Sequence, residues 1–105
     1  MVHHIVLFKL KPDITPEKVE EMMLNTRMQL LKIPEVTSVK CGKRIDPANE
    51  WPFFIAVEVE SMDKLSIYRD DPIHIKYVEE VIKPNTTERL ALDYEMEPGR
   101  DIRLS

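Results

Sequence analysis

Two kinds of hydrophobic periodicity alternate along this chain, and most of the segments that carry them are followed by a proline within a few residues. Four segments follow the two-residue period of β-strands, namely residues 2–11, 36–45, 51–60 and 87–96. Two segments follow the period of an α-helix: the first covers residues 16–32, and the second runs from Ser61 to Tyr68 and resumes at Pro72. The resulting order of elements is β-α-β-β-α-β.

That order predicts a single α+β domain of the ferredoxin-like class, in which helices cover one face of a four-stranded antiparallel sheet. A chain of 105 residues suits one such domain. The polar alternation of residues 36–45 predicts an edge strand. We expect the domain to span residues 1–97, and the polar residues 98–105 to form a C-terminal tail.

Apolar side chains of the first, third and fourth predicted strands also fall on the face of the sheet that the helices leave open. A monomer would expose this patch to water, and soluble monomers rarely expose a patch of that size. We therefore expect a homodimer in which two sheets pack face to face, a dimeric α/β barrel.

Composition disfavours several classes of function. The 15 Lys and Arg residues are outnumbered by 19 Asp and Glu residues without any basic cluster, so no nucleic-acid partner is expected. No apolar run approaches the length of a membrane span, and the N-terminus lacks the order of a signal peptide. The single cysteine, Cys41, cannot form an internal disulfide. We expect no membrane partner and a cytoplasmic location.

The segment from Tyr68 to His74 is the strongest candidate for a functional site. Asp71 and Pro72 break the second helix, which brings a phenol at the end of one helical piece close to an imidazole at the start of the next. A histidine can take a proton at neutral pH, and a tyrosine can donate a hydrogen bond to a developing oxyanion. The alternative is structural, with His74 packed at a helix start and Tyr68 filling the seam between helix and sheet.

Further candidates lie on the strands. His4 faces the same region if the even-numbered side of the first strand points toward the helices, where it could contact a ligand, orient His74 or bond a backbone carbonyl. Trp51 could line the mouth of a pocket or anchor a dimer. Asp93 is expected to pair with Arg89 or with a partner-chain lysine rather than to act as a catalytic carboxylate.

No metal and no cofactor are expected. His3 and His4 point to opposite faces of one strand, and together with His74 they lack the spacing of zinc ligands. Cys41 has no evident base beside it and is expected to be a packed side chain rather than a nucleophile.

Over residues 2–96 the chain resembles the stress-responsive dimeric α/β-barrel (Dabb) family. The resemblance rests on the opening strand, His4-Ile5-Val6-Leu7-Phe8-Lys9-Leu10-Lys11-Pro12, and on Tyr68-Arg-Asp-Asp-Pro-Ile-His74 with the downstream Leu92-Asp93-Tyr94. The family's second signature is similar: Tyr, three residues, Pro, one residue and His, then Asp and an aromatic residue. The resemblance implies a ferredoxin-like protomer and a homodimer with a β-barrel core.

One enzyme of that family, olivetolic acid cyclase, has a catalytic Tyr and His at the separation of Tyr68 and His74, and a strand histidine that matches His4. A further pocket histidine of that enzyme falls near Phe53, which makes Phe53 a candidate ligand-binding residue. Because this chain has no histidine in that strand, the resemblance implies a different pocket around Tyr68 and His74. The resemblance implies function only loosely, because many members have no known activity.

Three functions stay open on the sequence. The first is a stress-responsive dimeric α/β-barrel protein of undetermined activity that binds a small hydrophobic or carbonyl compound between helices and sheet. The second is a cofactor-independent enzyme, a polyketide cyclase-like lyase or isomerase, with His74 as base and Tyr68 as hydrogen-bond donor. The third is a structural oligomer without catalysis. A pocket that contains both Tyr68 and His74 favours the second.

Overall fold

A computed structural model describes residues 1–96, so the expected domain end at residue 97 and the expected tail, residues 98–105, lie outside the described residues. The elements are β1 (Val2–Leu10), α1 (Pro16–Leu30), β2 (Ser38–Lys43), β3 (Phe53–Val59), α2 (Met62–Asp70), α3 (Pro72–Tyr77), the π-helix η1 (Val78–Ile82) and β4 (Thr86–Glu95). The predicted β-α-β-β-α-β order is confirmed, with the second helical segment divided into three. No helix within residues 1–96 has the length and apolar character needed to cross a membrane.

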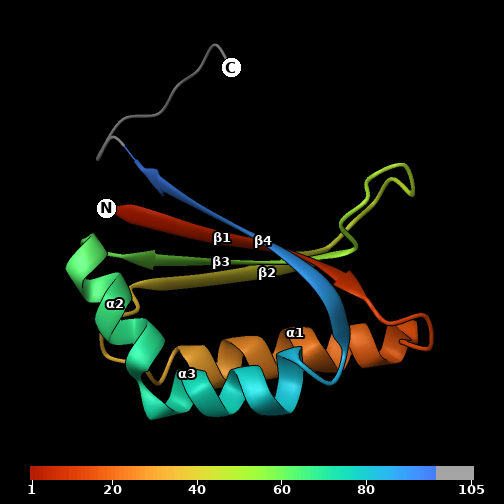
Figure 1. Cartoon of the computed structure of the whole chain (residues 1–105), viewed down its shortest axis with the longest axis horizontal. Coiled ribbons are helices and arrows are strands. Elements are labelled where there is room, and N and C mark those ends of the chain that lie inside the picture. Colours follow the sequence, from red (N-terminus) through yellow and green to blue (C-terminus); the bar gives the residue numbers. More distant parts are fainter. Residues whose placement is uncertain (97–105) are drawn as a thin grey trace.

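The four strands form one antiparallel sheet in the order β2-β3-β1-β4. Figure 1 shows α1, α2 and α3 together on one side of this sheet, while the opposite face is left open. The predicted ferredoxin-like class is confirmed, and β2 lies at an edge as its polar alternation predicted.

The side chains of β1 point alternately to two different environments. Val2, His4, Val6 and Phe8 are buried on the side that faces the helices, and the residues between them are only half-buried on the open side. The even-numbered face of β1 therefore points toward the helices. This places His4 beneath them, among the apolar side chains that β1 directs to the helices.

The ends of α1 follow from local signals. The Thr15 hydroxyl accepts a hydrogen bond from the backbone N–H of Lys18 at 3.1 Å, and Pro16 occupies the first turn. The helix ends at Leu30, earlier than predicted, because the N–H of Ile33 bonds the Leu30 carbonyl in a tighter three-residue turn. The buried stripe of α1 consists of Val19, Met22, Thr26 and Leu30.

The break between α2 and α3 has a steric cause. A proline disfavours the helical conformation of the residue before it, and Asp71 is accordingly extended, with φ −63° and ψ 132°. The Asp71 carboxylate then caps α3 by accepting a hydrogen bond from the N–H of Ile73 at 2.8 Å. Tyr68 consequently lies in the last turn of α2, and His74 lies in the first turn of α3.

Beyond Tyr77 the helix widens into η1, which the sequence pattern did not predict. The N–H of Lys83 bonds the carbonyl of Val78 at 2.9 Å, across five residues rather than four. The Asn85 side chain then donates to the Val81 carbonyl at 2.7 Å, where the segment ends. The wider turn carries Val78 and Ile82 toward the sheet, where they line the cavity described next.

Candidate functional site

A cavity of about 320 Å³ lies between the helix-facing side of the sheet and the segment α2-α3-η1. Both layers contribute to its wall: His4, Val6, Phe8, Ile55, Arg89 and Ala91 from the strands, and Tyr68, Arg69, His74, Tyr77, Val78 and Ile82 from the helices. Most of this wall is apolar, with a small number of polar groups, as in typical small-molecule sites. Three sequence-predicted site residues, His4, Tyr68 and His74, share this one space.

Tyr68 and His74 are neighbours across the helix break. Their ring centroids lie 4.5 Å apart, with the ring planes inclined at 46°. The rings of His4 and Tyr68 are in a T-shaped arrangement, with 6.4 Å between centroids. The phenol ring therefore has both imidazoles as neighbours.

The proton positions on His74 follow from its backbone contact. Its Nδ1 lies 3.0 Å from the carbonyl oxygen of Arg69, which can only accept, so Nδ1 carries a hydrogen. In the neutral ring the lone pair is then on Nε2. Burial lowers the pKa of His74, as do the charges of His4 and Arg69, while the bond to the Arg69 carbonyl and the charge of Asp71 act in the opposite direction. His74 is consequently a neutral imidazole at neutral pH.

Tyr68 has the complementary proton state. The residue is only 3% exposed, and burial raises the pKa of its phenol far above the usual value, against the smaller effect of the Arg69 charge. Within residues 1–96 no group is hydrogen-bonded to this hydroxyl. Among the same residues, no fully buried side-chain N or O atom lacks a hydrogen-bond partner, so the hydroxyl must keep some contact with solvent. Tyr68 lines the cavity and its hydroxyl is not sealed from solvent, so the hydroxyl is free to donate a hydrogen bond.

Asp93 holds His4 from the neighbouring strand. The two residues are direct partners between β1 and β4, and His4 Nδ1 lies 2.6 Å from Asp93 Oδ1. The Arg69 guanidinium lies 3.6 Å from the other carboxylate oxygen. The expectation that Asp93 pairs with Arg89 was wrong, because Asp93 faces the helices directly opposite His4 and pairs with His4 and Arg69. With Nδ1 engaged, the free ring nitrogen of His4 is Nε2.

The other two expected ligand-binding residues do not line this cavity. Phe53 is fully buried, and its ring packs against that of Phe8 at 5.9 Å between centroids. The Trp51 ring receives the ammonium group of Lys9 at 5.2 Å from its centroid. Phe53 thus supports a wall residue from behind, and the cavity gives no support to a ligand-binding role for Phe53 or Trp51.

Several wall residues were not predicted from the sequence, and the arginines matter most among them. Arg69 follows Tyr68 directly, and Arg89 lies on the helix-facing side of β4, opposite Phe8. Arg69 reaches the wall from the last turn of α2, whereas the place of Arg89 depends on the pairing of β4 with β1. A two-residue alternation counted back from Asp93 would have put Arg89 on the same face.

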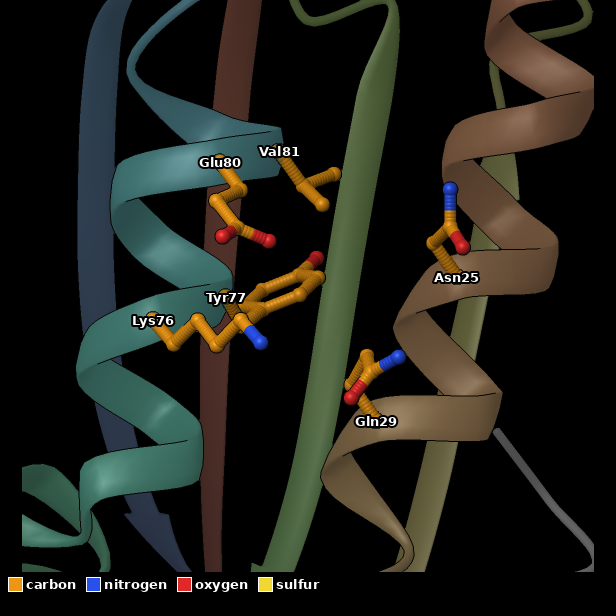
Figure 2. Close-up of a pocket in the computed structure, with 6 residues that line it drawn as sticks. All are labelled: Asn25, Gln29, Lys76, Tyr77, Glu80 and Val81. Carbon is orange, nitrogen blue, oxygen red and sulfur yellow. The ribbon is translucent and has the colours of Figure 1, made fainter.

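A second hollow, of about 210 Å³, lies between α1 and the segment α3-η1. Figure 2 shows its residues: Tyr77 points from α3 toward α1, between Asn25 and Gln29 on one helix and Lys76, Glu80 and Val81 on the other. Tyr77 also lines the cavity, so its ring divides the two spaces. Its hydroxyl lies 2.6 Å from the Thr26 hydroxyl, and this buried hydrogen bond joins α3 to α1. The Tyr77 hydroxyl therefore has a structural partner.

The remaining polar candidates are structural in their contacts. Cys41 is half-buried, its thiol donates to the Met23 carbonyl at 3.5 Å, and burial raises its pKa, so the unreactive thiol form persists at neutral pH. Across residues 1–96, no three His, Cys, Asp or Glu side chains gather in a way that could hold a metal ion.

Known proteins of similar sequence or structure share the fold of this chain. A stress-response A/B barrel domain-containing protein of Arabidopsis thaliana is 28% identical over 96 residues, which are 90% of this chain and 36% of that protein. The chain thus spans about a third of the length of this relative. Among solved structures, a dimeric ferredoxin-like protein of unknown function from Bacteroides fragilis is 25% identical, with a TM-score of 0.74 over 90% of this chain and 95% of that one.

A hydroxynitrile lyase from Passiflora edulis shares the fold, with a TM-score of 0.78 and 16% identity over 95% of this chain and 96% of the lyase. The model of the stress responsive A/B barrel domain, Dabb, matches residues 2–96, the whole of the described domain apart from Met1. The chain therefore belongs to the Dabb family of stress responsive A/B barrel domains.

Proposed function

We propose that the cavity binds a small, partly apolar carbonyl compound and that His74 and Tyr68 transfer a proton on it. The observation that carries the proposal is that the rings of Tyr68 and His74 lie 4.5 Å apart in the wall of one cavity. One ring can donate a proton, and the other has a nitrogen that can accept one. Burial favours a neutral His74 and a protonated Tyr68, which are the base and the acid that such chemistry needs.

The proposed step is the removal of a proton from the carbon next to the carbonyl. Nε2 of His74 takes the proton, and the electron pair of the broken C–H bond forms an enolate. The Tyr68 hydroxyl donates a hydrogen bond to the enolate oxygen as its negative charge develops. Where the compound has a double bond conjugated with the enolate, return of the proton to the far end of that double bond gives isomerisation. Attack of the enolate carbon on a second carbonyl forms an aldol C–C bond, whose new alkoxide takes up a proton. The reverse of that step breaks the C–C bond, which is a lyase reaction.

His4 and Asp93 have a positioning role in this proposal. Their 2.6 Å contact fixes the plane of the His4 ring against the edge of Tyr68. The Passiflora relative is a hydroxynitrile lyase, and its likeness to this chain supports only the view that such a fold can hold a lyase site.

We also propose that the functional unit is a homodimer. The open face of the sheet carries half-buried or exposed apolar side chains of three strands: Ile5, Leu7, Phe54, Leu90, Leu92 and Tyr94. The Bacteroides relative is described as dimeric. Sedimentation should give twice the mass of one chain, and a mass of 12.4 kDa would contradict the dimer.

The proton transfer can be tested without knowing the product. Small methyl ketones are incubated with the protein in deuterated water, and uptake of deuterium next to the carbonyl is followed by NMR. His74→Gln should reduce the catalysed rate by about 100-fold or more, as expected for loss of a general base. Tyr68→Phe should reduce it by about 100-fold, as expected for loss of an oxyanion donor.

His3→Gln provides the matched control. His3 lies on the opposite face of β1, where its ring is 3.4 Å from Glu58, so this change should leave the exchange rate unaltered. If ketones shift the resonances of His74 without exchanging protons, the cavity is a binding site only and the catalytic part of the proposal is refuted.

A further inference from the structure

We infer that the compound bound in the cavity carries an anionic group, a carboxylate, at the end remote from its carbonyl, and that Arg89 binds this group. The inference rests on the proposed function of the same cavity and adds to it the class of substrate. It assigns to Arg89 a role in selecting the substrate rather than in the proton transfer.

The first support is the sign of the charge around the cavity. The whole chain has a formal net charge of −4. Within residues 1–96, however, the cavity wall includes His4, Arg69, His74 and Arg89, and no Asp or Glu lines it. His74 is neutral at neutral pH, so the fixed charges of this wall are those of Arg69 and Arg89, and a mostly apolar wall with positive fixed charges attracts an anion.

The second support is that Arg89 lacks a protein counter-ion. Arg69 and His4 both contact Asp93, so the charge of Arg69 already has a protein counter-ion. Arg89 has no carboxylate within 4.0 Å among residues 1–96, although it faces the same space. The planar guanidinium suits two parallel hydrogen bonds to a carboxylate, which a lysine could not reproduce.

The surroundings of Arg89 leave it accessible to such a group. A shallower hollow of about 390 Å³ shares Val78, Ile82 and Arg89 with the cavity and continues toward Lys83. Lys83 contacts Glu79 at 2.5 Å, and Glu88, the acid of this hollow, contacts Lys9 at 3.1 Å. Arg89 therefore stands where the cavity opens, with its acidic and basic neighbours already paired.

Strand geometry sets the distance between the two ends of the compound. Arg89 and Asp93 lie on the same face of β4, four residues apart, and a strand advances about 13 Å over that interval. Ala91 and Val6 lie between them on the same side of the sheet. The ligand should thus have a carbonyl near His4 and Tyr68, an apolar middle part, and a carboxylate at Arg89.

The probes are straight-chain methyl-ketone carboxylic acids, from levulinate upward in chain length, each with its uncharged methyl ester. Binding is measured by NMR titration of the His74 and Tyr68 resonances. We expect acids of sufficient length to bind about tenfold or more tightly than their esters, as for one charge-assisted hydrogen-bonded contact. Arg89→Gln should abolish this difference in affinity, because it weakens binding of the acid and leaves binding of the ester unchanged. Arg89→Lys should retain only part of the difference.

Arg27→Gln is the matched control, because it removes the same charge from an exposed position on α1 that does not line the cavity. The role of Arg89 is refuted if acids and esters bind equally well to the unaltered protein. It is also refuted if Arg89→Gln and Arg27→Gln weaken binding of the acid equally. In both cases the carbonyl site remains. If neither acid nor ester shifts the His74 and Tyr68 resonances, the proposed function itself fails, and this inference fails with it.

Discussion

The imidazole of His4 and the carboxylate of Asp93 face each other directly across β1 and β4, with 2.6 Å between Nδ1 and Oδ1. The pair lies on the buried side of the sheet, where most neighbours are apolar. A charged group in such a place is costly unless it is bonded, and the His4 ring together with Arg69 supplies the partners. The pair therefore links the sheet to the end of α2, beside Tyr68.

Asp93→Asn should remove the negative charge of this contact while keeping the size and shape of the side chain. The asparagine amide can still accept a hydrogen bond from His4, but it no longer attracts Arg69. Because the Asp93 side chain is 30% exposed, we expect a loss of about 1 kcal/mol in the free energy of unfolding, measured with urea. Glu21→Gln, which breaks the exposed contact with Lys18, should cost less than about 0.5 kcal/mol. Equal losses would mean that the charge of Asp93 contributes no more stability than an exposed ion pair does.

The stability of the protein should depend on the protonation of His74. The folded protein has a lower pKa for this imidazole than the ordinary value of 6.5, chiefly because burial disfavours the charged ring. Below pH 6.5 the unfolded chain binds a proton that the folded chain does not, so the free energy of unfolding falls as the pH falls. Above that pH the contribution of the neutral ring is fully present.

Urea unfolding of the original protein and of His74→Gln at a series of pH values measures this effect. The variant should lose less stability between neutral and mildly acidic pH, and the difference between the two curves isolates His74 from His3 and His4. Identical slopes would show that His74 titrates equally in both states, and the proposed neutral base would lose its support.

Tyr68 and Tyr77 should respond differently to the same loss of a hydroxyl. Thr26 donates its hydroxyl hydrogen to the Met22 carbonyl at 2.7 Å, so the Tyr77 hydroxyl must donate to Thr26 at 2.6 Å. Tyr77→Phe should cost about 1 kcal/mol because it removes a buried hydrogen bond. Tyr68→Phe should change stability by less than about 0.5 kcal/mol, since no described residue bonds that hydroxyl.

Thermal or urea unfolding of the two variants provides the comparison, and each serves as the control for the other. A large loss for Tyr68→Phe would mean that its hydroxyl is part of the packing between α2 and the sheet. The structural alternative for Tyr68 would then replace the role as a hydrogen-bond donor to a ligand.

The parts of this molecule that depend on local rules could be predicted from the sequence. The two periods gave the order of the elements, Pro72 gave the helix break, and the even-numbered side of β1 gave the position of His4. Because these rules act over a few residues, the sequence alone was enough to place Tyr68 and His74 together.

The parts that could not be predicted depend on register and packing. Asp93 was assigned the wrong partner because only the pairing of β1 with β4 places it opposite His4. The wider turn of η1 was missed because its apolar spacing differs too little from that of an α-helix. The cavity could not be predicted, since its volume is the space that side chains from both layers leave unfilled.

On the open face of the sheet, Gly42 of β2 is the direct partner of Phe54 in β3. A Cβ atom at Gly42 would lie 2.7 Å from Cε1 of the Phe54 ring, so Gly42→Ala must displace that ring. The contacting atom belongs to the far end of a side chain that can turn, so one protomer should lose less than about 1 kcal/mol in stability. A dimer that packs sheet against sheet should be weakened about tenfold, because Phe54 would no longer fit the facing surface.

Sedimentation equilibrium across a range of concentrations measures the dissociation constant of the dimer, and urea unfolding measures the stability of the protomer. Lys64→Ala on α2, on the opposite side of the molecule, should leave the dissociation constant unchanged. If Gly42→Ala lowers stability but leaves the dissociation constant as it was, the ring of Phe54 lies outside the contact between protomers. The two copies of the chain would then have to associate through a surface other than the open face of the sheet.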